Sequence, residues 1–286
     1  MTNFEIVNIY SVMSETPTPR PEWAIDLEKV IAKKFPGKKL PKWLIKWLKK
    51  FIHQDLINSI VTRGYEGVDF CIDGVKCLDL HLEVEGVENV VLPEGAKMTF
   101  ASNHPLGGAD GVANVSVIAE HFDRDVKLLV NDFLMALPGL APISAPINKT
   151  GGQARNLPAM IKEFYESDST LMIFPAGLCS RRIKGKIQDL PWTKNFIKMS
   201  RATNRWVIPM HFIGRNSNRF YTIANLCKFF GIKFNLAMLF LPDELNRSQH
   251  KSYKIIFGKP IPPETFDSSK TDTEWAAWVR EKVYEL

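Results

Sequence analysis

A histidine and an aspartate share one glycine-rich turn at residues 102–111. His104 and Asp110 are separated by five residues, among them Gly107 and Gly108. A neutral imidazole accepts a proton near neutral pH, and a carboxylate at its other nitrogen fixes the tautomer. The glycines supply a backbone that lets the turn fold back. The pattern predicts a general base, His104, oriented by Asp110. The alternative that spacing leaves open is a structural histidine before a helix, with Asp110 as N-cap.

The sequence contains no serine nucleophile motif of the G-x-S-x-G kind. A base without its own nucleophile activates something from outside, which is water or a substrate hydroxyl or amine. The other histidines are scattered, without an i,i+4 ligand pair, so no metal site is expected. These histidines are His53, His81, His121, His211 and His250.

A second loop carries residues suited to an anion. An apolar strand expected at 170–174 runs into residues 175–182, which include a glycine, a serine and two arginines. This composition favours an anionic headgroup, and the alternative is an ordinary solvated basic loop. Residues 145–152, with Lys149, lead from a strand to a helix and could offer backbone amides to an anion. The G-K-[ST] order of a nucleotide-binding loop is missing there.

In this order and spacing, these segments resemble the PlsC-like glycerolipid acyltransferases of the lysophospholipid acyltransferase superfamily. Asn103-His104 with Asp110 is similar to the catalytic motif, and 174–177 with Ser180-Arg181 is similar to F-P-E-G-x-x-S-R. Residues 148–149 take the place of the block that usually carries an arginine, and 207–209 resemble the last block, V/I-P. The forms H-P-L-G-G-x-D-G and F-P-A-G-L-C-S-R-R resemble a hemolysin-like branch, which includes O-acyltransferases that complete ornithine or glycine lipids.

The chain departs from the family pattern at three points. The family has four residues between histidine and aspartate, where this chain has five. We expect the glycine pair to absorb the extra residue as a bulge. Ala176 replaces the family's glutamate, and Leu178-Cys179 replaces its threonine–arginine pair. The acceptor-contacting block therefore differs, which argues against lysophosphatidic acid itself as the acceptor.

The resemblance implies acyl transfer from a thioester to the hydroxyl of a mono-acylated lipid. The donor would be acyl carrier protein or coenzyme A, and no bound cofactor is expected. His104 would act as the base and Asp110 would orient it. The expected substrate-binding residues are Asn103, Gly107, Gly108, Lys149, Phe174, Pro175, Gly177, Ser180, Arg181, Arg182 and Pro209.

Composition limits the partners and the compartment. The 286-residue chain has a formal charge of +6 and a pI near 9.0, which favours an anionic membrane surface, nucleic acid or an acidic carrier protein. No nucleic-acid recognition motif is present, so nucleic acid is not expected. The four cysteines suggest free thiols in a reducing compartment. Without a secretory signal or a spanning apolar run, we expect a peripheral protein at the cytoplasmic face of the inner membrane.

The elements that position these residues follow an α/β pattern. Strands are expected at 79–85, 97–101, 126–130, 143–147, 170–174, 205–213 and 252–257, and helices at 112–121, 153–166, 192–203 and 273–285. A hairpin-like opening around Gly74 and Gly86 suggests antiparallel pairing. We therefore expect a mixed, mostly parallel central sheet flanked by helices, in a domain of residues 61–286.

An amphipathic helical segment, residues 1–60, is expected to precede that domain. Helices are predicted at 22–34 and 40–60. In the second, tryptophans and leucines fall on one half of the helix and lysines on the other. This pattern favours an interfacial membrane helix, and the alternative is a helix packed on the domain. Phe229, Phe230, Phe234 and residues 236–241 could line a route for an acyl chain, or belong to the core.

Two other functions stay open at this stage. One is a hydrolase in which His104 activates water, which would consume thioester without an acyl acceptor. The other is a non-catalytic or lytic membrane-binding protein, in which His104 would be dispensable.

Overall fold

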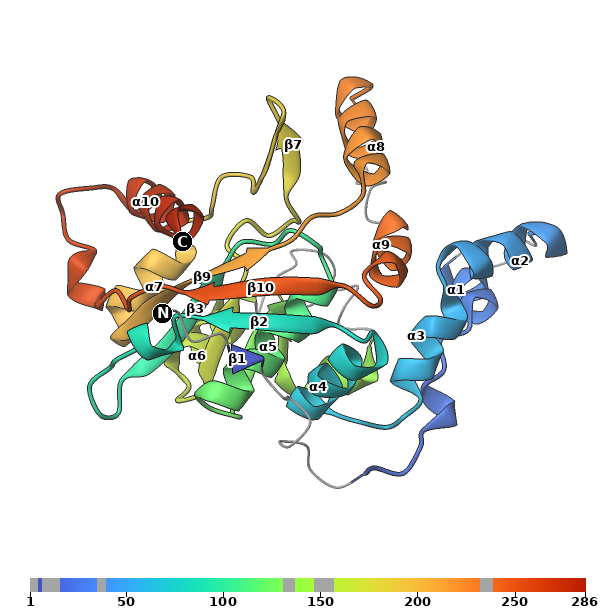
Figure 1. Cartoon of the computed structure of the whole chain (residues 1–286), viewed down its shortest axis with the longest axis horizontal. Coiled ribbons are helices and arrows are strands. Elements are labelled where there is room, and N and C mark those ends of the chain that lie inside the picture. The colour runs from blue at the N-terminus through green and yellow to red at the C-terminus, as the bar shows by residue number, and fades with distance from the viewer. Residues whose placement is uncertain (1–4, 7–15, 35–39, 131–136, 147–156, 232–238) are drawn as a thin grey trace.

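The computed structural model describes residues 5–6, 16–34, 40–130, 137–146, 157–231 and 239–286 (Figure 1). Within this part of the chain, an eight-stranded sheet has the order β1-β2-β10-β9-β3-β6-β4-β5. Its strands are β1 (Glu5–Ile6), β2 (His81–Glu85), β3 (Lys97–Ser102), β4 (Val126–Val130), β5 (Ser144–Pro146), β6 (Thr170–Ile173), β9 (Arg205–Ile213) and β10 (Ser252–Phe257). The β1–β2 and β9–β10 pairs are antiparallel and the others are parallel. The predicted mixed, mostly parallel α/β fold is confirmed.

Both faces of the sheet are buried. Phe100 of β3 packs into one apolar cluster and the next residue, Ala101, packs into the other. On β9, Ile208 and Val207 are divided in the same way. Because successive side chains of a strand point to opposite faces, these strands need a helical layer on each side.

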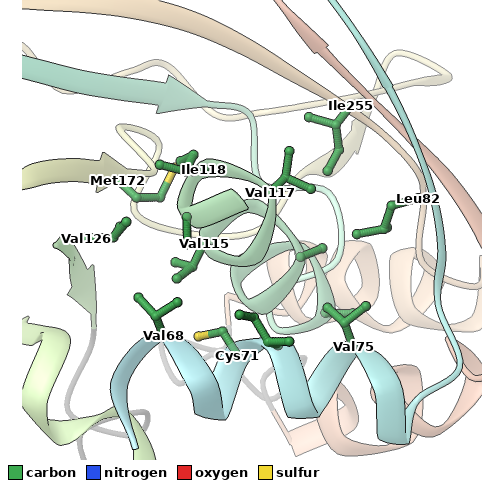
Figure 2. Close-up of a cluster of buried hydrophobic side chains, with 14 of the residues drawn as sticks. Val68, Cys71, Val75, Leu82, Val115, Val117, Ile118, Val126, Met172 and Ile255 are labelled. Carbon is green, nitrogen blue, oxygen red and sulfur yellow. The ribbon is translucent and has the colours of Figure 1, made fainter. Parts of the chain in front are cut away.

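Helices α4 (Gly67–Cys77) and α5 (Ala109–His121) cover one face. Figure 2 shows Val68, Cys71 and Val75 of α4 directed toward α5. Gly74 of α4 faces Val112 of α5, and a Cβ there would make ordinary van der Waals contact with Val112 Cγ1 at 3.8 Å. The other face is covered by α6 (Leu157–Glu166), α7 (Asn195–Thr203) and α10 (Asp272–Glu285).

The structure corrects the prediction at Gly74. This residue lies inside α4 and not in a hairpin-like opening. The antiparallel pairing arises instead between β9 and β10, and between β1 and β2. Two further helices, α8 (Asn218–Phe229) and α9 (Leu241–Arg247), and the hairpin of β7 (Arg181–Ile183) and β8 (Lys186–Gln188) were not predicted. The expectations for Phe234, for 147, for 153–156 and for 236–238 fall outside the described residues.

The N-terminal helices α1 (Leu27–Lys34), α2 (Lys42–Phe51) and α3 (Gln54–Val61) extend to one side of the sheet (Figure 1). The prediction of a single helix over 40–60 is wrong, because the helix is interrupted between the end of α2 at Phe51 and the start of α3 at Gln54. His53 takes a left-handed conformation there (φ 48°), and its Nε2 lies 3.0 Å from Asp243 Oδ1 of α9. The side chains of Ile60 and Val61 join the main core. Within the described residues, every helix is too short or too polar to cross a bilayer.

Candidate active site

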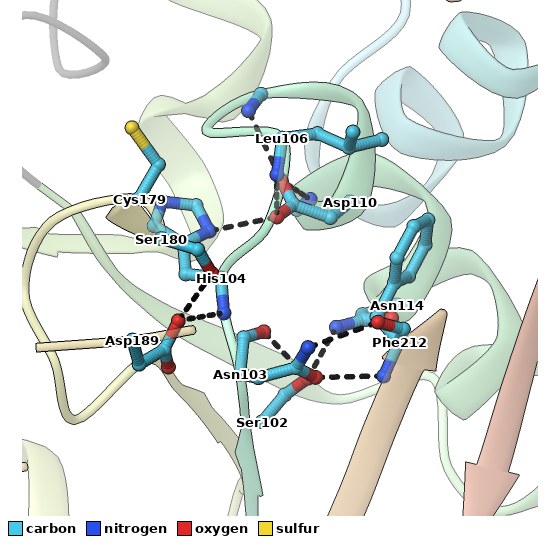
Figure 3. Close-up of polar contacts among 12 residues, drawn as sticks. Ser102, Asn103, His104, Leu106, Asp110, Asn114, Cys179, Ser180, Asp189 and Phe212 are labelled. Carbon is cyan, nitrogen blue, oxygen red and sulfur yellow. Dashed lines mark hydrogen bonds and ion pairs between the residues drawn. The ribbon is translucent and has the colours of Figure 1, made fainter. Parts of the chain in front are cut away.

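His104 is separated from the end of β3 by one residue, Asn103, and lies at the carboxyl end of this strand, between β9 and β6 in the sheet. In open α/β sheets this edge is where ligands bind. The His104 Nδ1 lies 2.9 Å from Asp110 Oδ2, and a dashed line marks this contact in Figure 3. Its side chain is 15% exposed, and Nε2 makes no hydrogen bond to another described residue. The geometry leaves Nε2 available to a reacting group.

Asp110 is fully buried and is surrounded by donors. Oδ2 accepts the backbone N–H of Leu106 as well as His104, and Oδ1 accepts those of Gly108 and Gly111, at 2.9–3.0 Å. Asp110 is the second residue of α5, and Gly108 is the N-cap. The alternative with Asp110 as N-cap is therefore wrong. The carboxylate instead accepts N–H groups from the turn before α5 and from Gly111 in its first turn, where the helix dipole favours a negative charge.

Gly107 makes room for the five-residue spacing. It has a φ of +82°, in the left-handed region that glycine adopts without strain. A Cβ at this position would lie 2.9 Å from Leu241 Cδ2 of α9 and 3.3 Å from Cys179 Cβ. The turn therefore closes against α9 and the second loop while still bringing His104 onto Asp110.

The histidine and the aspartate shift each other's pKa. Burial lowers the pKa of His104, but the charge and hydrogen bond of Asp110, with the charge of Asp189, outweigh it, so this pKa lies above its ordinary value. Burial raises the pKa of Asp110, but the charge of His104 and the bonds it accepts bring it below the ordinary value. Asp110 is thus ionised whenever His104 titrates, and it stabilises the imidazolium.

The loop after β6 begins with Phe174, whose ring packs on the imidazole of His104. The Phe174 ring stacks on the His104 ring, with centroids 4.0 Å apart and an interplanar angle of 28°. The Pro175 carbonyl accepts the N–H and hydroxyl of Thr193, which fixes the start of the loop. Gly177, at φ +67°, is exposed and has nothing near its Cβ position. The stacking fixes the plane of the base.

Asp189 joins the two loops, and sequence reasoning missed it. Its buried Oδ1 accepts the backbone N–H of His104 at 3.2 Å and the Ser180 hydroxyl at 2.6 Å. Its Oδ2 accepts the Trp192 indole N–H. The Asp189 N–H in turn donates to the Tyr284 hydroxyl of α10. Burial raises the pKa of the Asp189 carboxyl. No local motif marks this residue, because His104 and Tyr284 lie 85 and 95 residues away in the sequence.

Two asparagines also form hydrogen bonds that hold the turn at residues 102–111 in place. The Asn103 amide is used on β9, where it donates to the Phe212 carbonyl at 2.9 Å and accepts the Phe212 N–H at 2.7 Å. Asn216, which was not predicted, donates to the Leu106 carbonyl at 3.2 Å. In this structure Asn103 positions the strand end, and its contact with substrate stays a prediction.

Of the predicted anion-binding residues, Ser180 and Arg181 lie near His104, whereas Arg182 lies farther away. The Ser180 N–H donates to the His104 carbonyl at 2.7 Å, so Ser180 lies beside the catalytic turn. Arg181 lies over the Phe220 ring, donates to the carbonyls of Cys179 and Ser180, and lowers the pKa of His104 through its charge. Arg182 lies farther along β7 over the Tyr221 ring. Of the two arginines, Arg181 is therefore the one whose charge acts on His104.

The last two predicted residues lie elsewhere. Lys149 lies outside the described residues. Pro209 pairs with Ala101 across β9 and β3, accepts the Gly258 N–H, and lines a cleft of about 510 Å³ beside α10. Among the described residues, no three His, Cys, Asp or Glu side chains gather into a group that could hold a metal ion.

Comparison with known proteins places the chain in a family. The family model described as acyltransferase matches residues 29–286. A lyso-glycine lipid O-acyltransferase of Bacteroides thetaiotaomicron is 50% identical over 266 residues, covering 92% of this chain and 97% of that protein. A protein of the same name from Phocaeicola vulgatus is 48% identical over 267 residues, covering 92% and 95%. The crystal structure of the 1-acyl-sn-glycerophosphate acyltransferase PlsC of Thermotoga maritima is 16% identical, with a TM-score of 0.47, and the match covers 90% of this chain and 87% of that one. The chain belongs to the acyltransferase family, as the resemblance of its motifs predicted.

Proposed function

We propose that this enzyme transfers a fatty acyl group from an acyl thioester to the hydroxyl of a lyso-glycine lipid, with His104 as general base. The two relatives near 50% identity carry that acceptor in their names, which supports a lysolipid as the acceptor class. The observation that carries the catalytic proposal is His104, which has Nδ1 on Asp110 and Nε2 without a described partner.

The reaction balances with these groups and the two substrates. The acceptor hydroxyl oxygen attacks the thioester carbonyl carbon while its proton moves to His104 Nε2. The new C–O bond forms, the C–S bond breaks, and the leaving thiolate takes the proton back from Nε2. Acid–base help of this kind is worth about 10²–10⁴-fold in rate. The donor is a thioester of acyl carrier protein or coenzyme A, which acts as a substrate and not as a bound cofactor.

Arg181 is assigned to the anionic headgroup of the acceptor. Its charge reaches the imidazole, since it lowers the pKa of His104, and its guanidinium is held over Phe220. A planar guanidinium binds a carboxylate or phosphate through paired hydrogen bonds. Ser180 supports this loop through Asp189, since its hydroxyl donates to that carboxylate.

The reaction is tested with purified enzyme, an acyl thioester and a synthetic lyso-glycine lipid, with the product measured by mass spectrometry. We expect the diacylated lipid with wild type and none above background with His104→Ala. Retained transfer by that variant would overturn the assignment of the base. Release of free thiol and fatty acid, with no diacylated lipid, would indicate a hydrolase. A parallel reaction with lysophosphatidic acid tests the acceptor.

We infer that α2 holds the enzyme on an anionic membrane. Trp43 and Trp47 are 72% and 55% exposed, and no α2 side chain is buried. The tryptophans of the predicted apolar stripe are thus exposed, whereas Phe51 of the same stripe is half-buried against Phe240. Lys46 and Lys50 are exposed on the same helix. Indole rings favour the headgroup boundary, and each lysine near an anionic surface adds about 1 kcal/mol. Because acyl thioester donors are made in the cytoplasm, we assign the enzyme to the cytoplasmic face of the inner membrane.

Vesicle flotation tests this surface. We expect Trp43→Ser/Trp47→Ser to lose most binding to anionic liposomes. The control is Val91→Ser, because Val91 is 77% exposed and lies outside α2. Equal binding by the double variant and wild type would refute the role of α2.

A further inference from the structure

A tight turn presents two lysines at the tip of the β7–β8 hairpin. Ile183 pairs with Lys186, and the two residues between them, Lys184 and Gly185, have φ values of 48° and 82°. Two left-handed residues define a type I′ turn, in which asparagine and glycine are the favoured residues. A lysine there costs roughly 1–2 kcal/mol of backbone strain. The hairpin therefore holds Lys184 at its tip at some cost in stability.

Four of the cations on and beside this hairpin form no ion pair with a carboxylate of the described residues. We define the basic hairpin surface as Arg182, Lys184, Lys186 and Arg215, none of which forms an ion pair with a described carboxylate. Arg182 and Arg215 each donate to the same oxygen, Asn218 Oδ1, at 2.5 and 2.7 Å. Two guanidinium groups thus converge on one neutral amide. Like charges so close repel each other, and a bound anion would relieve that repulsion.

The surface continues directly from the active site. Ser180, whose N–H donates to the His104 carbonyl, is the residue before β7. In Figure 1 the hairpin that begins with β7 stands away from the sheet, on the same side as α8. Among the exposed large apolar side chains of the described residues, none lies on β7 or β8. The end of α8 exposes Phe229 and Phe230, which are therefore not part of the core, and α2 exposes two tryptophans. A polar, basic projection of this kind suits a soluble acidic partner better than the interior of a bilayer.

We propose that the basic hairpin surface docks an acidic acyl carrier protein, which delivers the thioester to His104. This inference rests on the proposed function, since the acyl group delivered is the one transferred. Charge complementarity speeds encounter and orients the carrier so that its flexible arm enters beside Ser180. The acidic carrier protein would then bind the basic hairpin surface, and the anionic membrane would bind α2.

The test compares two donors with the same acyl chain: acyl carrier protein thioester, and acyl-pantetheine, which is small and uncharged. The variant is Lys184→Glu/Lys186→Glu, at two exposed positions outside the active site. We expect its kcat/KM with the carrier to fall about tenfold or more, as like charges are placed opposite an acidic partner. Its kcat/KM with acyl-pantetheine should match wild type. Added salt should lower the wild-type rate with the carrier much more than that of the variant.

The control, Lys251→Glu/Lys259→Glu, makes the same change in net charge at two exposed positions at the ends of β10. It should leave both donors unaffected. Equal loss of rate with both donors, loss of binding to anionic vesicles by the hairpin variant, or unimpaired use of the carrier would each overturn the docking proposal. Use of acyl-coenzyme A by wild type, with no use of the carrier, would also overturn it. Failure of wild type to acylate a lysolipid from any thioester would instead refute the proposed function.

Discussion

Asp110→Asn should keep His104 in the site but remove the carboxylate that sets its tautomer. In wild type, Oδ1 accepts two backbone N–H groups and Oδ2 accepts a third together with His104 Nδ1. An asparagine keeps one oxygen. That oxygen will take the Oδ1 position, because an NH₂ there would face two donors instead of one. The NH₂ group is then placed against His104 and the Leu106 N–H.

The consequence for catalysis follows from the tautomer. An NH₂ donating to Nδ1 makes that nitrogen the acceptor, so the neutral ring carries its proton on Nε2 and cannot accept one there. We expect kcat to fall by about 10²–10⁴-fold, the full value of the base. The Leu106 N–H, facing a donor in a buried site, should also cost about 1–3 kcal/mol of stability.

The assay must separate these two effects. Acyl transfer is measured under saturating substrate, and the free energy of unfolding is measured in urea. Val117→Ala is the matched control, because Val117 is fully buried on the same helix and its truncation should cost about 2 kcal/mol without touching the site. We expect this control to keep most of its activity. If folded Asp110→Asn stays within about tenfold of wild type, below the range for general base catalysis, the argument from the tautomer is wrong.

Three further outcomes follow from the same geometry. A protonated His104 cannot accept a proton, so kcat/KM should fall as pH decreases, with its midpoint above the ordinary histidine pKa in wild type and at lower pH in Asp110→Asn. Asp189→Asn should move that midpoint down by a smaller amount, because the charge of Asp189 raises the pKa of His104 less than that of Asp110; an unchanged midpoint would contradict this. Gly107→Ala should lower the unfolding free energy by about 1–2 kcal/mol, through its left-handed φ, and reduce kcat by displacing the turn; urea unfolding and the transfer assay measure both.

Local patterns predicted most of the sheet. The strands at 126–130, 205–213 and 252–257 lie where the alternation of apolar residues placed them. Helix α10 differs from its prediction by one residue at its start, because the Thr271–Glu274 capping box is a local signal. The contact between His104 and Asp110 was likewise predicted, since both residues belong to one turn.

The features that were missed depend on contacts between distant residues. Gly74 is a turn signal in isolation, but it lies buried inside α4, where the helix packs on α5. His53 breaks the predicted helix without a glycine or proline, while its imidazole contacts Asp243 of α9. Asp189 accepts the backbone N–H of His104, which lies 85 residues earlier in the sequence. A single sequence carries no signal for such partners when no motif includes them.

The contact between His104 and Asp110 depends on the direction in which the carboxylate points, and not on the number of residues between the two. A four-residue spacing in this chain would take its carboxylate from Ala109, the first residue of α5. Adjacent helix positions differ by about 100° around the axis, so a carboxylate there would point away from the direction that Asp110 takes. The extra residue is therefore compatible with the base only because Gly107 bends the turn at φ +82°, with Leu241 closing the space beside it. The same bend brings the Leu106 and Gly108 N–H groups onto the carboxylate, so that the turn which lengthens the motif also holds its charge.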